Sequence, residues 1–227
     1  MKAFNPSRLI LSGGTCEALK WLGVVLMTCD HINRFLLKGT QPHWFEAGRL
    51  ALPLFTFVLA YNLARPGALS CGVYPRTMKR LALFGFISMP VCSALGGLAA
   101  GWWPLNILFT LLAATTTLFL LEQGKKGAAI FCFLLSGFVV EYEWFGIALC
   151  IPVWLYCKAP SWKTIFLTML SLAGLRLING NYWAFAAIPV VAVVSTTTIS
   201  IRRQKWLFYA FYPLHLMVLL ICKGLLR

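Results

Sequence analysis

The chain has 227 residues, of which 60% are hydrophobic and 11% are charged, and its mean hydropathy is +0.79. This composition excludes an ordinary water-soluble domain, because apolar runs near the length of a bilayer span recur from end to end and a spanning helix needs about 20 such residues. The net charge of +14 comes from short basic clusters between these runs and forms no long basic stripe, so we expect no nucleic-acid partner.

The apolar pattern predicts nine helices. In chain order they lie near 17–37, 44–64, 77–98, 105–122, 127–140, 144–158, 163–178, 182–200 and 205–226. The fifth and sixth are short for a membrane span, so they either form a re-entrant pair or cross a locally thinned bilayer. We expect an all-α, polytopic integral membrane helical bundle, a single domain over residues 1–227, read as mature, with the lipid bilayer around it.

The basic residues of the turns predict the orientation of this bundle. Inner turns would contain Arg65, Arg76, Lys79, Arg80, Lys125, Lys126, Lys158, Lys163, Arg202, Arg203 and Lys205. Outer turns would contain Arg34 and Lys38 at a helix end, no basic residue at 99–104, and Glu141 with Glu143. Because lysine and arginine concentrate in cytoplasmic loops, the N-terminus is expected inside and the C-terminus outside.

The eight cysteines show no C-x-x-C pair and no spacing typical of metal ligands. Most lie within apolar runs, where cysteine behaves as a small hydrophobic residue. We therefore expect neither a disulfide framework nor a metal site.

Ionisable residues within the first two helices are the strongest sign of a functional site. The first helix contains Asp30, His31 and Arg34, and the second contains Glu46 and Arg49 near its start. Each such group costs about 2.5–3.5 kcal/mol at the centre of a membrane helix, so it persists where it faces protein and has a role.

Helical geometry separates the roles of Asp30 and His31, because adjacent side chains point about 100° apart. Asp30 and Arg34 share a face and are expected to form an ion pair, which either only locks the first helix or contributes to function. His31 is the side chain best suited to proton transfer near neutral pH, although a neutral histidine can also be a satisfied core group.

Two prolines are expected to open the backbone beside candidate residues. Pro53 lacks the N–H that would bond the carbonyl of Arg49. Arg49 then either pairs with Asp30 or Glu46, or binds a substrate phosphate or a developing oxyanion. His215 follows Pro213 by two residues in the last helix.

Three further polar sites have ordinary structural interpretations. Asn106 begins a helix after Pro104, Glu141 and Glu143 resemble an exposed acidic turn, and Asn179 lies in a loop of little specificity.

Several segments together resemble the TraX family of conjugation proteins, the pilin acetylase family. They are LKWLGVVLMTCDHIN, AGRLALPLFTFVLAYNLAR, PLNILFTLL, EYEWFG and FYAFYPLHL. The combination of DH, a following GR-x-x-x-PLF and a terminal YPLHL is specific, and the resemblance covers nearly the whole chain. The YNLARPGA and GWWPLN stretches are more similar to the TrbP-type branch, for which the acceptor is less certain.

The resemblance implies a multi-pass enzyme of the bacterial inner membrane. Its members acetylate the N-terminus of the pilin subunit with acetyl-CoA as co-substrate, and they resemble wider membrane acyltransferases that use an intramembrane histidine. The matched positions are Asp30, His31, Gly48, Arg49, Pro53, Asn106 and His215. The expected catalytic residues are His31, Asp30 and Arg49, and the expected substrate-binding residues are Arg34, Glu46, Asn106 and His215.

The chemistry of the residues is compatible with that implication, because an α-amine with a pKa of about 7.7–8.0 is partly nucleophilic at neutral pH. His31 or His215 would remove its proton. Two alternatives stay open: a non-catalytic conjugation component such as a pilin chaperone or mating-channel subunit, and a small transporter that uses Asp30 and His31 as a proton relay. A polar pocket open to the cytoplasmic face would favour the enzyme.

Overall fold

The computed structural model describes residues 6–96 and 101–226 of the chain, and this part is helical without a named β-strand. The helices are α1 (Gly13–Phe35), α2 (Pro42–Gly48), α3 (Ala51–Leu63), α4 (Val73–Ala94), α5 (Ile107–Glu122), α6 (Lys126–Gly137), α7 (Glu143–Lys158), α8 (Trp162–Gly174), α9 (Arg176–Asn179), the 3₁₀ helix η1 (Trp183–Ala186), α10 (Ala187–Ser195) and α11 (Leu207–Leu225). The all-α prediction is confirmed.

Every predicted helical segment contains helix, but three of the nine are divided. The second is broken at Arg49 and Leu50, the seventh becomes α8 and α9, and the eighth becomes η1 and α10, which ends at Ser195. The first begins earlier than predicted because the Ser12 hydroxyl accepts from the Thr15 N–H and caps α1. Residues 97–98 of the third predicted helix lie outside the described residues.

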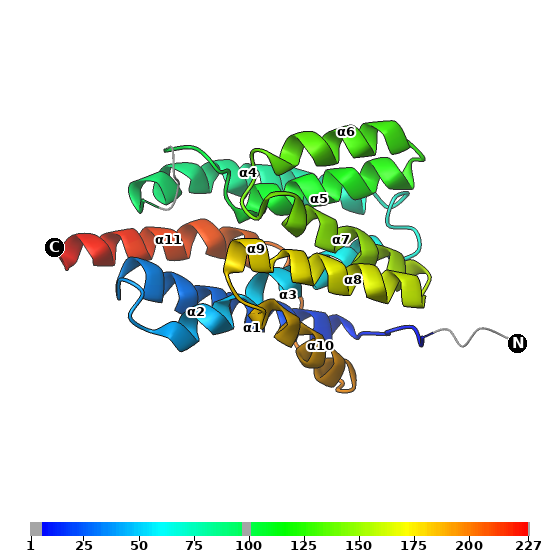
Figure 1. Cartoon of the computed structure of the whole chain (residues 1–227), viewed down its shortest axis with the longest axis horizontal. Coiled ribbons are helices and arrows are strands. Elements are labelled where there is room, and N and C mark those ends of the chain that lie inside the picture. Colours follow the sequence, from blue (N-terminus) through cyan, green and yellow to red (C-terminus); the bar gives the residue numbers. More distant parts are fainter. Residues whose placement is uncertain (1–5, 97–100, 227) are drawn as a thin grey trace, which may run out of the picture.

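The first helix is the element that positions the others around the site. It packs against α2, α3, α10 and α11, while α11 also packs along α4. Figure 1 shows α11 between the group formed by α1 and α2 and the group formed by α4, α5 and α6. Residues that are distant in the sequence therefore meet along one side of α1.

The turns lie at the two ends of this bundle in the arrangement that the charge pattern predicts. Figure 1 shows the α3–α4, α5–α6 and α7–α8 turns at the end where the N-terminus lies. The α1–α2 turn, the end of α4 and the C-terminal end of α11 lie at the opposite end. These three basic turns thus share one end of the molecule.

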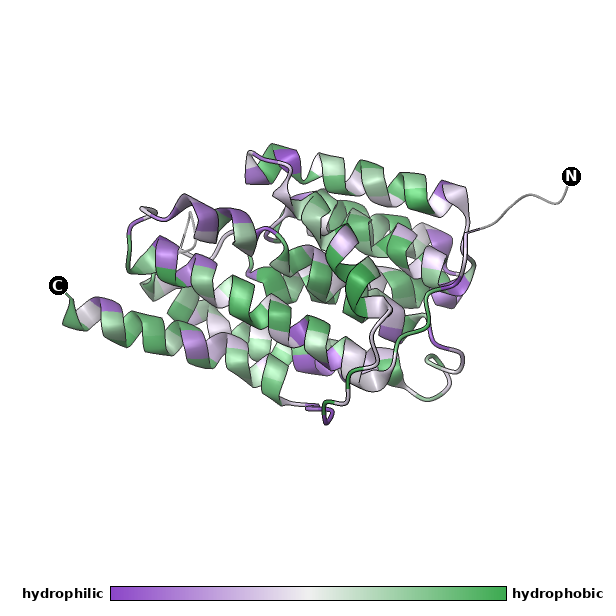
Figure 2. Ribbon diagram, turned by 90° about the horizontal axis from the view of Figure 1, so that it is seen from below, coloured by the Kyte–Doolittle hydropathy of each residue, from purple (hydrophilic) through white to green (hydrophobic). Residues whose placement is uncertain are grey.

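Large apolar side chains cover much of the outside of the helices. On α6 they are Ile130, Phe131, Leu134 and Leu135, which are all more than half exposed. Figure 2 shows hydrophobic residues along the outer faces of the helices and hydrophilic ones mainly toward the turns. Within the described residues, α11 meets the length and apolarity expected of a membrane span, whereas α5, α6 and the η1–α10 segment are shorter apolar helices. Polytopic insertion stays a prediction.

The orientation can be tested by labelling single cysteines in a cysteine-free background. Thr40 and Trp102 are exposed at one end of the bundle, and Lys126 is exposed at the other. A membrane-impermeant thiol reagent applied from the periplasm should label Thr40→Cys and Trp102→Cys but not Lys126→Cys, because basic turns stay cytoplasmic. Labelling of Lys126→Cys with none at Thr40→Cys would reverse the orientation.

Candidate functional site

A direct contact between two histidines joins the first and last helices. Nδ1 of His31 on α1 lies 2.7 Å from Nε2 of His215 on α11. The two rings are stacked, with an interplanar angle of 7° and centroids 5.0 Å apart. Both residues were expected at the site, and the structure brings them together.

The hydrogen-bond partners assign the protons of this pair. Nδ1 of His215 lies 2.9 Å from the carbonyl oxygen of Phe211, which can only accept, so this nitrogen carries the hydrogen. When both rings are neutral, Nε2 of His215 must accept and Nδ1 of His31 must donate. The lone pair on Nε2 of His31 is then left outside the pair. Of the two rings, His31 is therefore the one whose second nitrogen can accept a proton, and His215 accepts the hydrogen bond from it.

Aromatic side chains enclose the histidine pair. The ring centroid of Tyr212 lies 6.4 Å from that of His31 and 5.5 Å from that of His215. Phe35 lies 5.7 Å from His31, and Phe211 stacks on His215 at 5.1 Å. His215 is 7% exposed, whereas His31 is half-buried. By side-chain exposure, His31 is thus the less buried ring of the pair.

Beside His31, Asp30 pairs with Arg49 across the interface of α1 with the α2–α3 segment. A guanidinium nitrogen of Arg49 donates to Asp30 Oδ2 at 2.5 Å, and both side chains are almost buried. Arg49 also donates to the Phe45 carbonyl at 3.2 Å and to Asn179 Oδ1 at 3.4 Å. This outcome matches the predicted pairing of Arg49 with Asp30. The predicted ion pair of Asp30 with Arg34 is absent from the described residues, and Arg34 is exposed over the Phe35 ring.

Gly48 explains why Arg49 reaches Asp30. A Cβ atom on Gly48 would overlap the side chain of Asp30, so only glycine lets α2 lie this close to α1. The chain then turns through Arg49 and Leu50, whose N–H groups bond to Glu46 and Ala47 over shortened turns. This break lies where Pro53 was predicted to open the backbone.

Two expected substrate-binding residues lie apart from the histidines. Glu46 faces the outside of α2, where its carboxylate lies 3.1 Å from Nδ1 of the exposed His43. Asn106 is 1% exposed and caps α5, because its oxygen accepts from the Leu108 N–H and its amide donates to the Gly85 carbonyl at 3.0 Å. Its bonds are those of a structural residue.

Two polar residues near the site were underestimated from the sequence. Asn179, expected in an unremarkable loop, is buried and bonded to Arg49. Glu141 is half-buried rather than exposed, and this burial raises the pKa of its carboxyl, although the charges of Arg34 and Arg49 partly oppose the shift. The backbone there is left-handed at Tyr142 and Glu143. The EYEWFG segment was the sequence feature that could have drawn attention to Glu141, but the sequence does not specify how this turn folds.

A cavity of about 490 Å³ leads from the basic end of the bundle toward the histidines. Its outer part is lined by Lys20, Arg76, Arg80, Arg203 and Lys205, and its inner part by apolar residues that include Met27, Leu108 and Leu111. Tyr212 also lines it, and this ring contacts both histidines. Met27 lies one helical turn before His31. Through Tyr212, a basic mouth and an apolar interior are thus continuous with the surroundings of the histidine pair.

Gly48→Ala should destabilise the fold by about 1–3 kcal/mol, the usual cost of overpacking a tight contact. Thermal unfolding of the purified protein measures this. Gly127→Ala is the matched control, since Gly127 is also helical but has open space around its Cβ position. Equal stability of the two variants would show that the approach of α2 to Asp30 is not tight.

Comparison with known proteins identifies the family of the chain. The family model described as TraX protein matches residues 15–223. Protein TraX of Escherichia coli strain K12 is 29% identical over 94% of this chain and 89% of its own length, and a second Protein TraX from Escherichia coli is 31% identical over the same shares. No solved structure matches significantly. The matched span covers the positions of both histidines and of the Asp30–Arg49 pair, and the chain belongs to the TraX family.

Proposed function

We propose that this protein is a multi-pass enzyme of the bacterial inner membrane that transfers an acetyl group from acetyl-CoA to the N-terminus of pilin. The observation that carries the proposal is the cavity with a basic mouth that reaches Tyr212 beside the His31–His215 pair. A site that only held helices together would need the histidine contact but not this access.

The cavity has the chemistry that a CoA thioester requires. Basic side chains at its mouth besides Lys20, namely Arg76, Arg80, Arg203 and Lys205, suit the phosphates of the nucleotide part, because charge-assisted bonds to phosphate are among the strongest in proteins. The apolar interior suits the less polar arm that carries the acetyl group. Lys20 and His31 are eleven residues apart on α1, or roughly 16 Å along the helix, a distance comparable to the length of that extended arm.

The chemical step needs a base rather than a covalent intermediate. The pilin α-amine attacks the acetyl carbonyl carbon, so that a C–N bond forms and the C–S bond to CoA breaks. Nε2 of His31 takes the proton that the nitrogen loses and then passes it to the departing thiolate. The hydrogen bond to His215 holds the His31 ring in the required tautomer and shares the positive charge while the proton is on it.

Asp30 and Arg49 support this step from the neighbouring face. Arg49 contacts an aspartate, an amide and a backbone carbonyl at once, as its planar guanidinium allows. The pair fixes α2 against α1 next to His31 and places a positive charge near the oxyanion that develops. We assign both as positioning residues of the proposed site.

Exposed apolar side chains on the outside of the bundle support the proposed insertion into a membrane. Phe131 on α6, Phe166 on α8 and Ile221 on α11 are each more than half exposed. Water-soluble monomers rarely show apolar surfaces this continuous, whereas a bilayer accommodates them without cost. The basic turns at one end then mark the cytoplasmic side, where acetyl-CoA is available.

The non-catalytic alternative has one observation in its favour. Asp30 pairs with Arg49, and His31 pairs with His215, so these ionisable groups partner one another as a scaffold would require. The basic cavity is the feature that this alternative leaves without a role. Measurements on the cavity and on His31 therefore separate the two functions.

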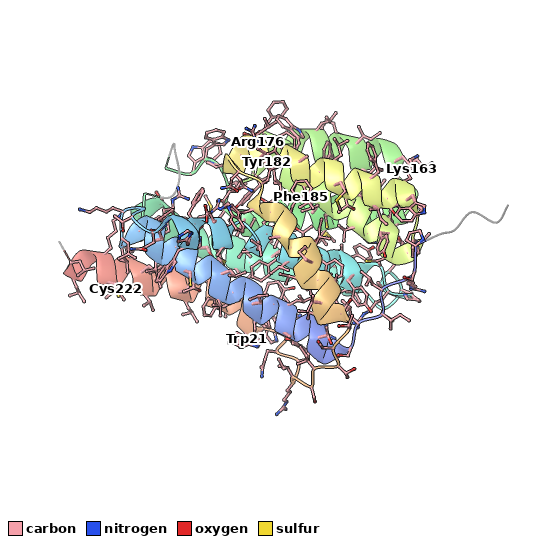
Figure 3. The ribbon with its side chains drawn as sticks, turned by 60° about the horizontal axis from the view of Figure 1, so that its bottom comes forward. Trp21, Lys163, Arg176, Tyr182, Phe185 and Cys222 are labelled. Carbon is pink, nitrogen blue, oxygen red and sulfur yellow. The ribbon has the colours of Figure 1, made fainter. Side chains whose placement is uncertain are left out.

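Arg203→Gln should raise the KM for acetyl-CoA about tenfold with little change in kcat, because it removes one charged contact to phosphate. Steady-state kinetics of the purified protein with a pilin peptide bearing a free N-terminus measures this. Lys163→Gln is the control, since Lys163 is an exposed basic residue on α8 that does not line the cavity. Figure 3 shows Lys163 at one end of α8, whereas Arg176 and Tyr182, which contact each other, lie near the opposite end. Equal KM values in both variants would remove the cavity from donor binding.

His31→Gln should lower kcat by about 10²–10⁴-fold, the usual effect of losing a general base, while the protein reaches normal membrane levels. Glutamine keeps a polar side chain toward His215 but cannot take up the proton. His215→Gln should cost less, because the base and its free nitrogen remain. Turnover by His31→Gln equal to that of the wild type would exclude His31 as the base.

A further inference from the structure

The segment between α10 and α11 lies against the N-terminal part of α1 and has no helix from residue 198 to residue 204. The Thr15 hydroxyl donates to the Thr197 carbonyl at 3.1 Å, and the Ser12 hydroxyl donates to the Ile199 carbonyl at 3.3 Å. A Cβ on Gly14 would overlap that Ile199 carbonyl. We call residues 197–205 the strap.

Glu17 of α1 bonds to the C-terminal end of the strap. It is 2% exposed, and its Oε2 accepts from the backbone N–H of Gln204 at 3.3 Å. Its Oε1 accepts from the ammonium group of Lys20 at 2.5 Å. One buried carboxylate thus bonds both a cavity-lining lysine of α1 and the backbone of the strap.

The strap forms one wall of the basic cavity. It contributes Arg203, Gln204 and Lys205 to a lining that also includes Arg76 and Arg80 of α4. Among the described residues that line the cavity, none is acidic. The like charges that share this lining repel one another in the absence of an anion, so the repulsion acts to separate the strap from α4. The Glu17 bonds oppose this.

The strap continues directly into α11, the helix of His215. Trp206 and Phe208 follow it; Arg80 lies over the Trp206 ring, and Lys20 lies 4.2 Å from the centre of the Phe208 ring. Trp21 of α1 packs edge-on against Phe208 with centroids 5.2 Å apart, and Figure 3 shows Trp21 on the side of α1 near this segment. These ring contacts hold the start of α11 against α1 and α4 independently of the Glu17 bonds.

We infer that Glu17 is a positioning residue that holds the strap closed over the cavity, so that Arg203 and Lys205 complete a binding site for the phosphate groups of the donor. This inference rests on the proposed function, since it takes the donor to be a CoA thioester. In this arrangement the strap controls the affinity for the donor, while the chemical step at the histidine pair is unchanged.

The test compares the purified wild type with Glu17→Gln in two measurements. Trypsin cleavage reports opening, because the strap contains Arg202, Arg203 and Lys205; the variant should be cleaved about tenfold faster, and the KM for acetyl-CoA should rise about tenfold with kcat almost unchanged. Glu122→Gln is the matched control, since Glu122 pairs with Lys158 and does not line the cavity. It should match the wild type in both.

A second variant keeps the test independent of the folding of Glu17→Gln. Thr15→Val removes the hydroxyl that bonds Thr197 and should change cleavage and KM in the same direction by a smaller factor. Wild-type cleavage rates in Glu17→Gln, or a fall in kcat at unchanged KM, would overturn the role of Glu17. If the variant is cleaved faster but the wild type does not bind CoA, the assignment of a CoA donor is wrong, while the role of Glu17 in holding the strap stands.

Discussion

The hydrogen bond between His31 and His215 is the interaction on which the arrangement of the site depends. Polar groups inside an apolar bundle must find partners, because an unpaired one costs free energy. The first and last helices satisfy each other through this contact, and the Phe211 carbonyl satisfies the remaining nitrogen of His215. Of the four ring nitrogens in the pair, Nε2 of His31 is the one left without a partner among the described residues, and the proposed chemistry rests on it.

The remaining polar residues hold this pair between two ends of different character. At the basic end, the cavity and the strap suit an anionic donor. Toward the other end, Asp30, Arg49 and Asn179 bring α1, the α2–α3 break and α9 together. An acceptor that arrives from that end would meet the donor at His31. The two substrates of the proposed reaction would then reach His31 by separate routes. Separate routes are what a transfer between opposite sides of a membrane would need.

The sequence predicted the helices better than it predicted their contacts. The 3.6-residue pattern located α5 and α7 closely, since buried helical faces leave a local signal. It singled out His31 and His215 separately, but 184 residues separate them and periodicity does not specify which helices pack together. The Asp30–Arg34 pair was wrong because spacing within one helix ignored the close approach that Gly48 permits. The cavity had no local signal, because its walls come from separate helices and the strap.

The most direct test of the central claim is the intact mass of the pilin made in cells with and without this protein. The proposed acetyltransferase predicts that pilin is heavier by one acetyl group at its N-terminus when the wild-type protein is present, and that the group is missing when it is absent or carries His31→Gln. Pilin of identical mass in all three strains would contradict the claim and favour the non-catalytic role.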